Sequence, residues 1–123
     1  MTARFKDLVL DAADHHRLAD WWCSALGYVR KDSVTGYADR PLDWPVPIIP
    51  GDADGDGHGP LIWIVPVTEA KTLKNRMHID VWGDTDELVA LGATLLRRRD
   101  DDITWDVLAD PEGNEFCVFE PRA

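Results

Sequence analysis

Residues 7–27 read DLVLDAADHHRLADWWCSALG, and this stretch decides the fold. In a strand over its first five residues, Leu8 and Leu10 would share one face and Asp7, Val9 and Asp11 the other, which is typical of a half-buried strand. Asp14 is then placed to cap a helix whose apolar residues recur at helical spacing, and Gly27 is placed to end that helix. The stretch therefore predicts a strand followed by an amphipathic helix.

The same strand–helix unit returns in the second half of the chain. Residues 78–82, HIDVW, form another alternating segment. Asp84 can cap the following helix while Glu87 reaches back to it, as in a capping box. Both helices close on Ala-Leu-Gly, at 25–27 and at 90–92. A tripeptide repeated at the same place in two units indicates a duplicated module.

Strand-like runs follow each helix, so the element order is β-α-β-β-β, twice. We therefore expect an α+β fold in which two βαβββ modules in one chain form a curved mixed sheet around a cleft. The whole chain would be one domain, with module one at about 4–67, a polar linker at 68–76 and module two at about 77–122. The runs predicted as later strands are 28–31, 36–39, 61–67, 94–97, 104–108 and 115–120.

Residues 40–50 hold four of the eight prolines. Proline cannot donate to a strand ladder, so this segment is not expected to be a central strand. We interpret it as a rigid excursion over the surface or the mouth of the cleft.

Composition limits the class of protein. With 123 residues, 45% hydrophobic and 29% charged, the chain suits one globular domain. No apolar run is long enough for a membrane helix, and the N-terminus passes straight into a strand pattern, so no signal peptide is expected. Two cysteines, Cys23 and Cys117, are too few for a disulfide scaffold and indicate a cytoplasmic protein.

The formal net charge of −10 has two interpretations. A strongly acidic surface repels phosphate backbones, which argues against a nucleic-acid partner, and it attracts cationic ligands or basic proteins. Alternatively, the acidity only confers solubility.

Alternation assigns side chains to the two faces of a strand. In residues 77–82, Met77, Ile79 and Val81 point toward one face of the strand. His78, Asp80 and Trp82 point toward the other face. The purely apolar faces should pack on the helices, which leaves the mixed faces to line the cleft. The predicted ligand-binding residues on these faces are Asp11, Trp63, Asp80, Trp82, Trp105, Glu115 and Cys117.

Six tryptophans are many for this length. Core packing is one explanation, and we expect at least one of Trp21 and Trp22 in the core. An aromatic wall in the cleft is the other, since it would hold a planar or cationic ligand by stacking and cation–π contact. Carboxylates clustered beside such a wall could act as general bases or neutralise a bound amine.

Three motifs carry a family resemblance. They are LVLD at 8–11 leading to ALGY at 25–28, KNRMHID at 74–80, and DPEGNEFC at 110–117. In this order they resemble the vicinal oxygen chelate superfamily of glyoxalase, bleomycin-resistance and extradiol-dioxygenase-like proteins, in particular its glyoxalase-like branch. The resemblance implies paired βαβββ modules, a small-molecule ligand and a homodimer.

The resemblance also implies where a divalent metal would bind. Enzymes of the superfamily hold one with an inward residue from each of four strands, usually His, Gln or Glu. The matching positions here are Asp7, a residue at or near Val65, His78 and Cys117, and only Asp7 and His78 are ordinary ligands. We therefore expect no cofactor. The open alternative is a divalent metal held by Asp7 and His78, with Cys117 as an unusual third ligand.

The functional prediction has the same two branches. The first is ligand binding or sequestration without a metal. The alternative is a metal-dependent lyase, isomerase or dioxygenase of the glyoxalase type.

A calcium loop is a further candidate. Residues 51–57, GDADGDG, contain the start of such a loop, but the position that requires a bidentate Glu is Trp63. A solvated loop is the better interpretation.

Overall fold

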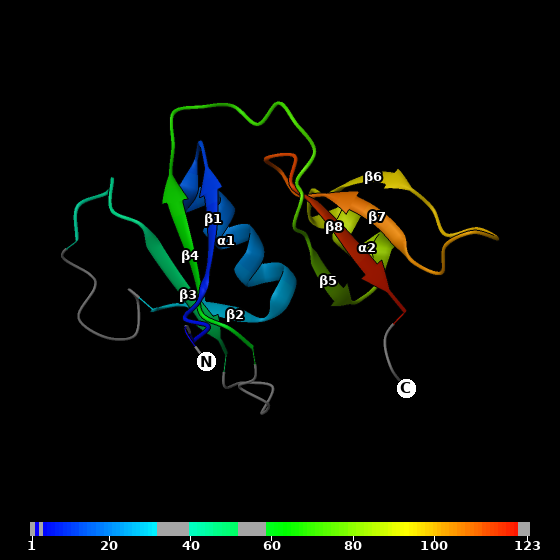
Figure 1. Ribbon diagram of the computed structural model, residues 1–123, viewed down its shortest axis with the longest axis horizontal. Coiled ribbons are helices and arrows are strands. Elements are labelled where there is room, and N and C mark those ends of the chain that lie inside the picture. The colour runs from blue at the N-terminus through cyan, green and yellow to red at the C-terminus, as the bar shows by residue number, and fades with distance from the viewer. Residues whose placement is uncertain (1, 3, 32–39, 52–58, 121–123) are drawn as a thin grey trace. The chain divides into compact units, whose positions relative to one another are not determined.

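The computed structural model describes residues 2, 4–31, 40–51 and 59–120 (Figure 1). Contacts divide the chain into two compact units, Met1–Glu69 and Ala70–Ala123, and the boundary falls inside the predicted linker. Over these described residues, each unit contains one four-stranded mixed sheet and one α-helix, in the order strand, helix and three strands. The predicted α+β fold of two βαβββ modules is thereby confirmed.

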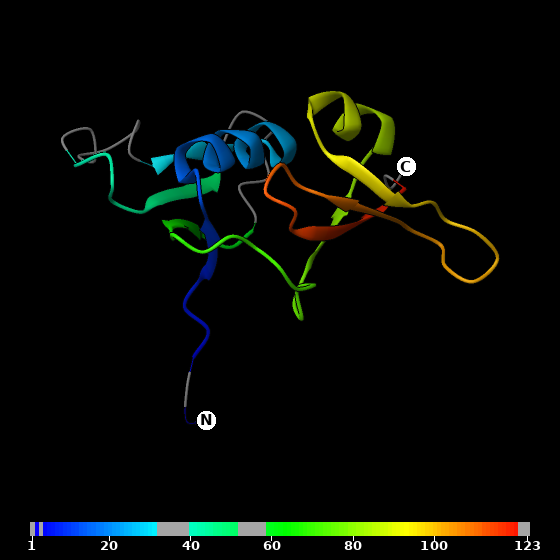
Figure 2. The ribbon, with the colours of Figure 1, turned by 90° about the horizontal axis from the view of Figure 1, so that it is seen from above.

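In the first unit the sheet has the order β1-β4-β3-β2, and only the β1–β4 pair is parallel. Helix α1 covers one face of this sheet (Figure 2). The elements are β1 (Leu8–Ala12), α1 (His15–Leu26), β2 (Tyr28–Arg30), β3 (Val46–Pro50) and β4 (Ile62–Pro66).

Helix α1 begins and ends as its sequence predicts. The Asp14 side chain accepts a hydrogen bond from the Arg17 backbone N–H, and Gly27 takes the left-handed conformation at φ 71° that favours glycine. Both Trp21 and Trp22 are buried in the core. These two buried indole rings contribute to the apolar core of this small unit.

The prediction for residues 40–50 is wrong in its second half. Val46–Pro50 form β3, an inner strand of the sheet. Its ladder with β4 covers Val46–Ile48, and its ladder with β2 covers Ile48–Pro50. Pro47 and Pro50 are therefore each paired on one side only, and a residue paired on one side can lack an N–H without breaking the sheet.

The excursion itself is confined to the residues before β3. The rings of His15 and His16, at the start of α1, contact the backbone oxygens of Trp44 and Leu42 at 3.0 and 2.7 Å. These contacts hold the segment against the helix.

The second unit repeats the plan with the order β5-β8-β7-β6 and a parallel β5–β8 pair. Its core is apolar and centres on Phe116, Leu108 and Val118. Asp84 caps α2 by accepting from the Glu87 N–H, as predicted. The elements are β5 (Ile79–Trp82), α2 (Thr85–Leu91), β6 (Thr94–Arg97), β7 (Asp106–Ala109) and β8 (Glu115–Phe119).

Two sequence predictions lie outside the described residues: the strand at 36–39 and nearly all of the candidate calcium loop. Trp63, at the position where that loop would need a glutamate, lies inside β4. Among the helices of the described part of the chain, neither α1 nor α2 is long and apolar enough to cross a membrane.

Candidate functional site

The open face of the second sheet gathers chemically active side chains. The parallel ladder pairs Asp80 with Cys117 and Trp82 with Phe119, which places these four side chains on one face. Phe116 and Val118 alternate with them and are buried on the helix side. The structure thus separates a buried apolar face from a mixed open face, as strand alternation predicts.

An aromatic row crosses this open face. The Phe119 ring lies 5.9 Å from the Trp82 ring and 5.6 Å from the Trp105 ring. Trp82 is 60% exposed although it belongs to a strand. A hollow of about 200 Å³ is lined by Asp80, Val81, Trp82 and Phe119. A second hollow of about 390 Å³ continues along Trp82 and Phe119; its other lining residues are Arg99, Asp100, Ile103, Thr104 and Glu120.

Beside the aromatic row, His78, Asp80 and Cys117 converge. The His78 Nδ1 atom lies 3.3 Å from Asp80 Oδ1 and 4.0 Å from Cys117 Sγ. His78 and Asp80 have side chains that are 42% and 57% exposed, whereas Cys117 is buried. Burial, followed by the negative charge of Asp80, raises the pKa of the Cys117 thiol above its usual value.

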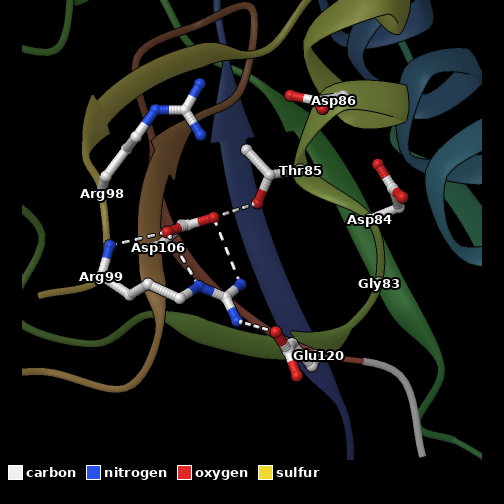
Figure 3. Close-up of a pocket in the computed structure, with 8 residues that line it drawn as sticks. All are labelled: Gly83, Asp84, Thr85, Asp86, Arg98, Arg99, Asp106 and Glu120. Atoms are coloured by element: carbon white, nitrogen blue, oxygen red, sulfur yellow. Dashed lines mark hydrogen bonds and ion pairs between the residues drawn. The ribbon is translucent and has the colours of Figure 1, made fainter.

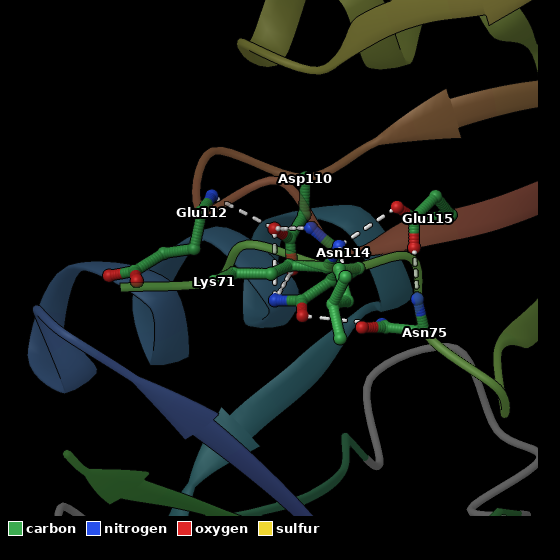
Figure 4. Close-up of polar contacts among 7 residues, drawn as sticks. Lys71, Asn75, Asp110, Glu112, Asn114 and Glu115 are labelled. Carbon is green, nitrogen blue, oxygen red and sulfur yellow. Dashed lines mark hydrogen bonds and ion pairs between the residues drawn. The ribbon is translucent and has the colours of Figure 1, made fainter. Parts of the chain in front are cut away.

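Glu115, another predicted ligand-binding residue, is already bonded (Figure 4). It accepts from Lys71 Nζ and from the Asn75 backbone N–H, both at 2.9 Å. Burial disfavours its charge, but the hydrogen bonds from Asn75 and Lys71 outweigh this and hold the pKa of the carboxyl below its usual value. Glu115 therefore joins the segment before β5 to the start of β8.

The adjoining turn is held by Asp110. Its carboxylate accepts from the backbone N–H groups of Glu112 and Asn114, each at 2.9 Å, and from the Asn114 amide (Figure 4). Gly113 closes the turn at φ 88°, where a side chain would be strained. The DPEGN motif thus fixes where β8 begins and sets the position of Cys117.

In the first unit, Asp7 and Trp63 occupy the positions that correspond to His78 and Cys117. β1 pairs Leu8 with Ile62 as β5 pairs Ile79 with Phe116, so Trp63 occupies the place that Cys117 has in the second unit. The register therefore replaces Val65 by Trp63 as the second metal position. The Trp63 Nε1–H donates to Asp7 Oδ2 at 3.0 Å.

These residues do not fit the four-strand metal centre of the family. The indole of Trp63 is a donor only and has no lone pair for a metal. The Asp7 side chain is 7% exposed and also pairs with Lys6 at 2.6 Å. Asp11, predicted to bind ligand, lies exposed on β1 opposite Val65.

Sequence reasoning missed a buried carboxylate on the helix side of the second sheet, Asp106 (Figure 3). It accepts from Thr85 Oγ1 at 2.5 Å and from the Arg99 N–H at 2.7 Å, and its side chain is 5% exposed. Burial opposes its charge, but hydrogen bonds from Arg99 and Thr85 prevail and lower the pKa of Asp106 to about 2. Asp106 faces Val118, a core residue, in the β7–β8 ladder. Knowledge of this register would have shown that Asp106 is buried.

Asp106 lines a hollow of about 390 Å³ at the start of α2. Arg99 also pairs there with Glu120 at 2.8 Å (Figure 3). All the hydrogen bonds described for the Asp106 carboxylate are with Thr85 and Arg99, so we assign it a structural role. It connects β7 to α2 and to the loop between β6 and β7.

The duplicated βαβββ plan, in which the first and last strands of each module form a parallel pair, is the fold of vicinal oxygen chelate proteins. The model of the glyoxalase-like domain family matches residues 7–119, and the chain belongs to that family. Its predicted family membership is thereby confirmed. A search of curated proteins gave no match.

Solved structures share the fold. A hypothetical protein from S. aureus aligns with a TM-score of 0.61 at 16% identity, over 98% of this chain and 99% of that one. The trypanothione-dependent glyoxalase I of Leishmania major gives 0.59 at 18%, over 97% and 87%. The fosfomycin resistance protein FosX of Listeria monocytogenes, in complex with Mn(II) and 1S,2S-dihydroxypropylphosphonic acid, gives 0.67 at 12%, over 99% and 95%. At these identities the likeness concerns the fold.

Proposed function

We propose that this chain binds or sequesters a small aromatic ligand on the open face of its second unit, without the four-strand metal centre of its family. The observation that carries the proposal is the row formed by Trp82, Phe119 and Trp105 beside two hollows. Trp82 and Phe119 belong to strands and Trp105 directly precedes one, so the exposed Trp82 ring and its two half-buried neighbours offer a fixed stacking surface. In the first unit, the Asp7–Trp63 hydrogen bond occupies the place where two metal ligands would be needed.

The charges around the row favour a cationic or neutral aromatic ligand over an anion. Asp80 lines the smaller hollow together with Trp82. Arg99 lines the larger one, but its charge is matched by Asp106 and Glu120. A cation over the indole would gain cation–π attraction and the field of Asp80, in a chain of net charge −10.

Tryptophan fluorescence titration tests this proposal with probes of similar size: N-methylquinolinium, 2-naphthol and 2-naphthoate. We expect affinity to fall in that order. Trp82→Ala should weaken the cation about fivefold, because a stacked contact at an exposed site contributes about 1 kcal/mol. Trp44→Ala, which removes a half-exposed indole from the first unit, is the matched control. Tightest binding of 2-naphthoate, or equal losses in both variants, would refute the proposal.

The alternative function is a metal-dependent lyase, isomerase or dioxygenase of the glyoxalase type. The specific observation in its favour is the convergence of His78, Asp80 and Cys117. This function requires turnover that depends on added metal and is lost in His78→Ala.

Three further expectations belong to the proposal. The two modules act as one domain that pairs into a homodimer, because each four-stranded sheet leaves edge strands that pairing would cover. A monomeric mass in light scattering would contradict the dimer. The protein works in the cytoplasm, in keeping with two cysteines, Cys23 and Cys117, that form no disulfide. Neither nucleic acid nor a membrane is a partner.

A further inference from the structure

We propose that His78, Asp80 and Cys117 form a zinc-type metal site contained entirely within the second unit, which keeps two metal positions of the family, His78 and Cys117, and takes Asp80 as its third ligand. The inference does not rest on the proposed aromatic ligand, although the two sites share Asp80, which also lines the smaller hollow. It rests on the convergence of three different ligand atoms.

The three atoms surround one point. His78 Nδ1, a carboxylate oxygen of Asp80 and Cys117 Sγ all lie within 4.8 Å of one another. Bond lengths of roughly 2.0–2.3 Å to zinc imply ligand separations of about 3.3–3.8 Å in a tetrahedral site. The His78–Asp80 distance of 3.3 Å already meets this range, and the His78–Cys117 distance of 4.0 Å is close to it. Small side-chain rotations would complete the chelate.

The same geometry argues against a nucleophilic relay. A cysteine–histidine–aspartate relay needs the thiol on one ring nitrogen and the carboxylate on the other. Here both Asp80 and Cys117 approach Nδ1 of His78. A single nitrogen facing a carboxylate and a thiol is an arrangement that a cation would satisfy.

The fold holds the three ligands in place. Asp80 and Cys117 are register partners in the parallel β5–β8 ladder, and His78 directly precedes β5. Cys117 is buried while the other two side chains are half-exposed, so an ion would enter from the open side. With three protein ligands, the fourth position of a tetrahedral ion stays open to water or a small ligand.

The donor set selects the metal. One thiolate, one imidazole and one carboxylate suit zinc or a similar transition metal, whereas magnesium and calcium require oxygen ligands. Asp7, the family's first-strand ligand, does not contribute, since it is bonded to Trp63 and Lys6. Asp80, which is not one of the family's metal positions, supplies the third ligand of the proposed site.

Cobalt(II) titration is the test, because a cobalt–thiolate bond gives a charge-transfer band in the near ultraviolet. We expect this band to saturate at one ion per chain and to disappear when zinc is added. It should be lost in Cys117→Ser and retained in Cys23→Ser, the matched thiol control. Asp80→Asn and His78→Ala, which alter half-exposed side chains, should each weaken cobalt binding about tenfold or more.

Asp7→Asn separates this site from the family centre and should leave cobalt affinity unchanged. The proposal is overturned if excess cobalt gives no thiolate band, if Cys23→Ser abolishes it, or if Asp7→Asn costs as much affinity as Asp80→Asn. Circular dichroism of each variant establishes that it is folded. Titration of N-methylquinolinium in the presence of a chelator measures the proposed function separately, so either idea can fail alone.

Discussion

Asp106 offers the prediction with the best-defined magnitude. Replacing it by asparagine keeps the shape of the side chain but removes the charge that Arg99 and Thr85 stabilise. The pKa of Asp106 falls from 3.8 to about 2 in the folded protein. At 1.36 kcal/mol per pKa unit, the charge contributes about 2 kcal/mol to the free energy of unfolding near neutral pH.

The direction of the pKa shift of Asp106 determines the pH range in which its stabilising effect is lost. A carboxyl whose pKa is lowered on folding contributes its full stability above the unfolded value, and the contribution is lost as pH falls through the folded value. Urea unfolding of the wild type and Asp106→Asn should therefore differ by about 2 kcal/mol at pH 6. The difference should shrink steadily between about pH 4 and pH 2.

The control is Asp101→Asn, which neutralises an exposed carboxylate in the loop before β7. It should change stability by less than about 0.5 kcal/mol. If Asp106→Asn were equally mild at pH 6, or if its cost did not vary between pH 4 and pH 2, the reasoning about its charge would be refuted.

Three other outcomes are expected. Saturating zinc should weaken N-methylquinolinium binding severalfold and leave 2-naphthol unaffected, because an ion would neutralise Asp80; equal effects in fluorescence titrations would contradict this. Glu115→Gln should speed hydrogen exchange of the Asn75 amide, which loses its charged acceptor, as read by NMR, and unchanged exchange would show that this bond is not needed. Protein at micromolar concentration should scatter light as a dimer, and a monomeric mass would exclude the proposed homodimer.

The sequence is most informative where the spacing of its residues matches the repeat of a strand or a helix. Alternation separates Asp80 and Trp82 from the buried side of β5, and the repeated Asp cap and Ala-Leu-Gly closure identify both helices. These features depend on local geometry, which neighbouring residues specify. They were enough to assign the fold and to place Asp80, Trp82 and Cys117 on one face of the second sheet.

Features that depend on pairing register could not be read in the same way. Trp63 rather than Val65 corresponds to Cys117, and this follows only from which residues face each other across β1 and β4. Pro47 was misjudged because its position in a ladder paired on one side is a property of the sheet. The partners of Glu115, from a segment about 40 residues earlier, depend on tertiary contacts in the same way.

If the proposed function is right, a ligand binds the aromatic row of the second unit, formed by Trp82, Phe119 and Trp105. Indole N–H signals in a two-dimensional NMR titration with N-methylquinolinium test this most directly, since each of the six tryptophans gives its own signal. We expect the signals of Trp82 and Trp105 to shift together, while those of the buried Trp21 and Trp22 in the first unit stay in place. Shifts confined to the tryptophans of the first unit, with Trp82 and Trp105 unmoved at saturation, would contradict it.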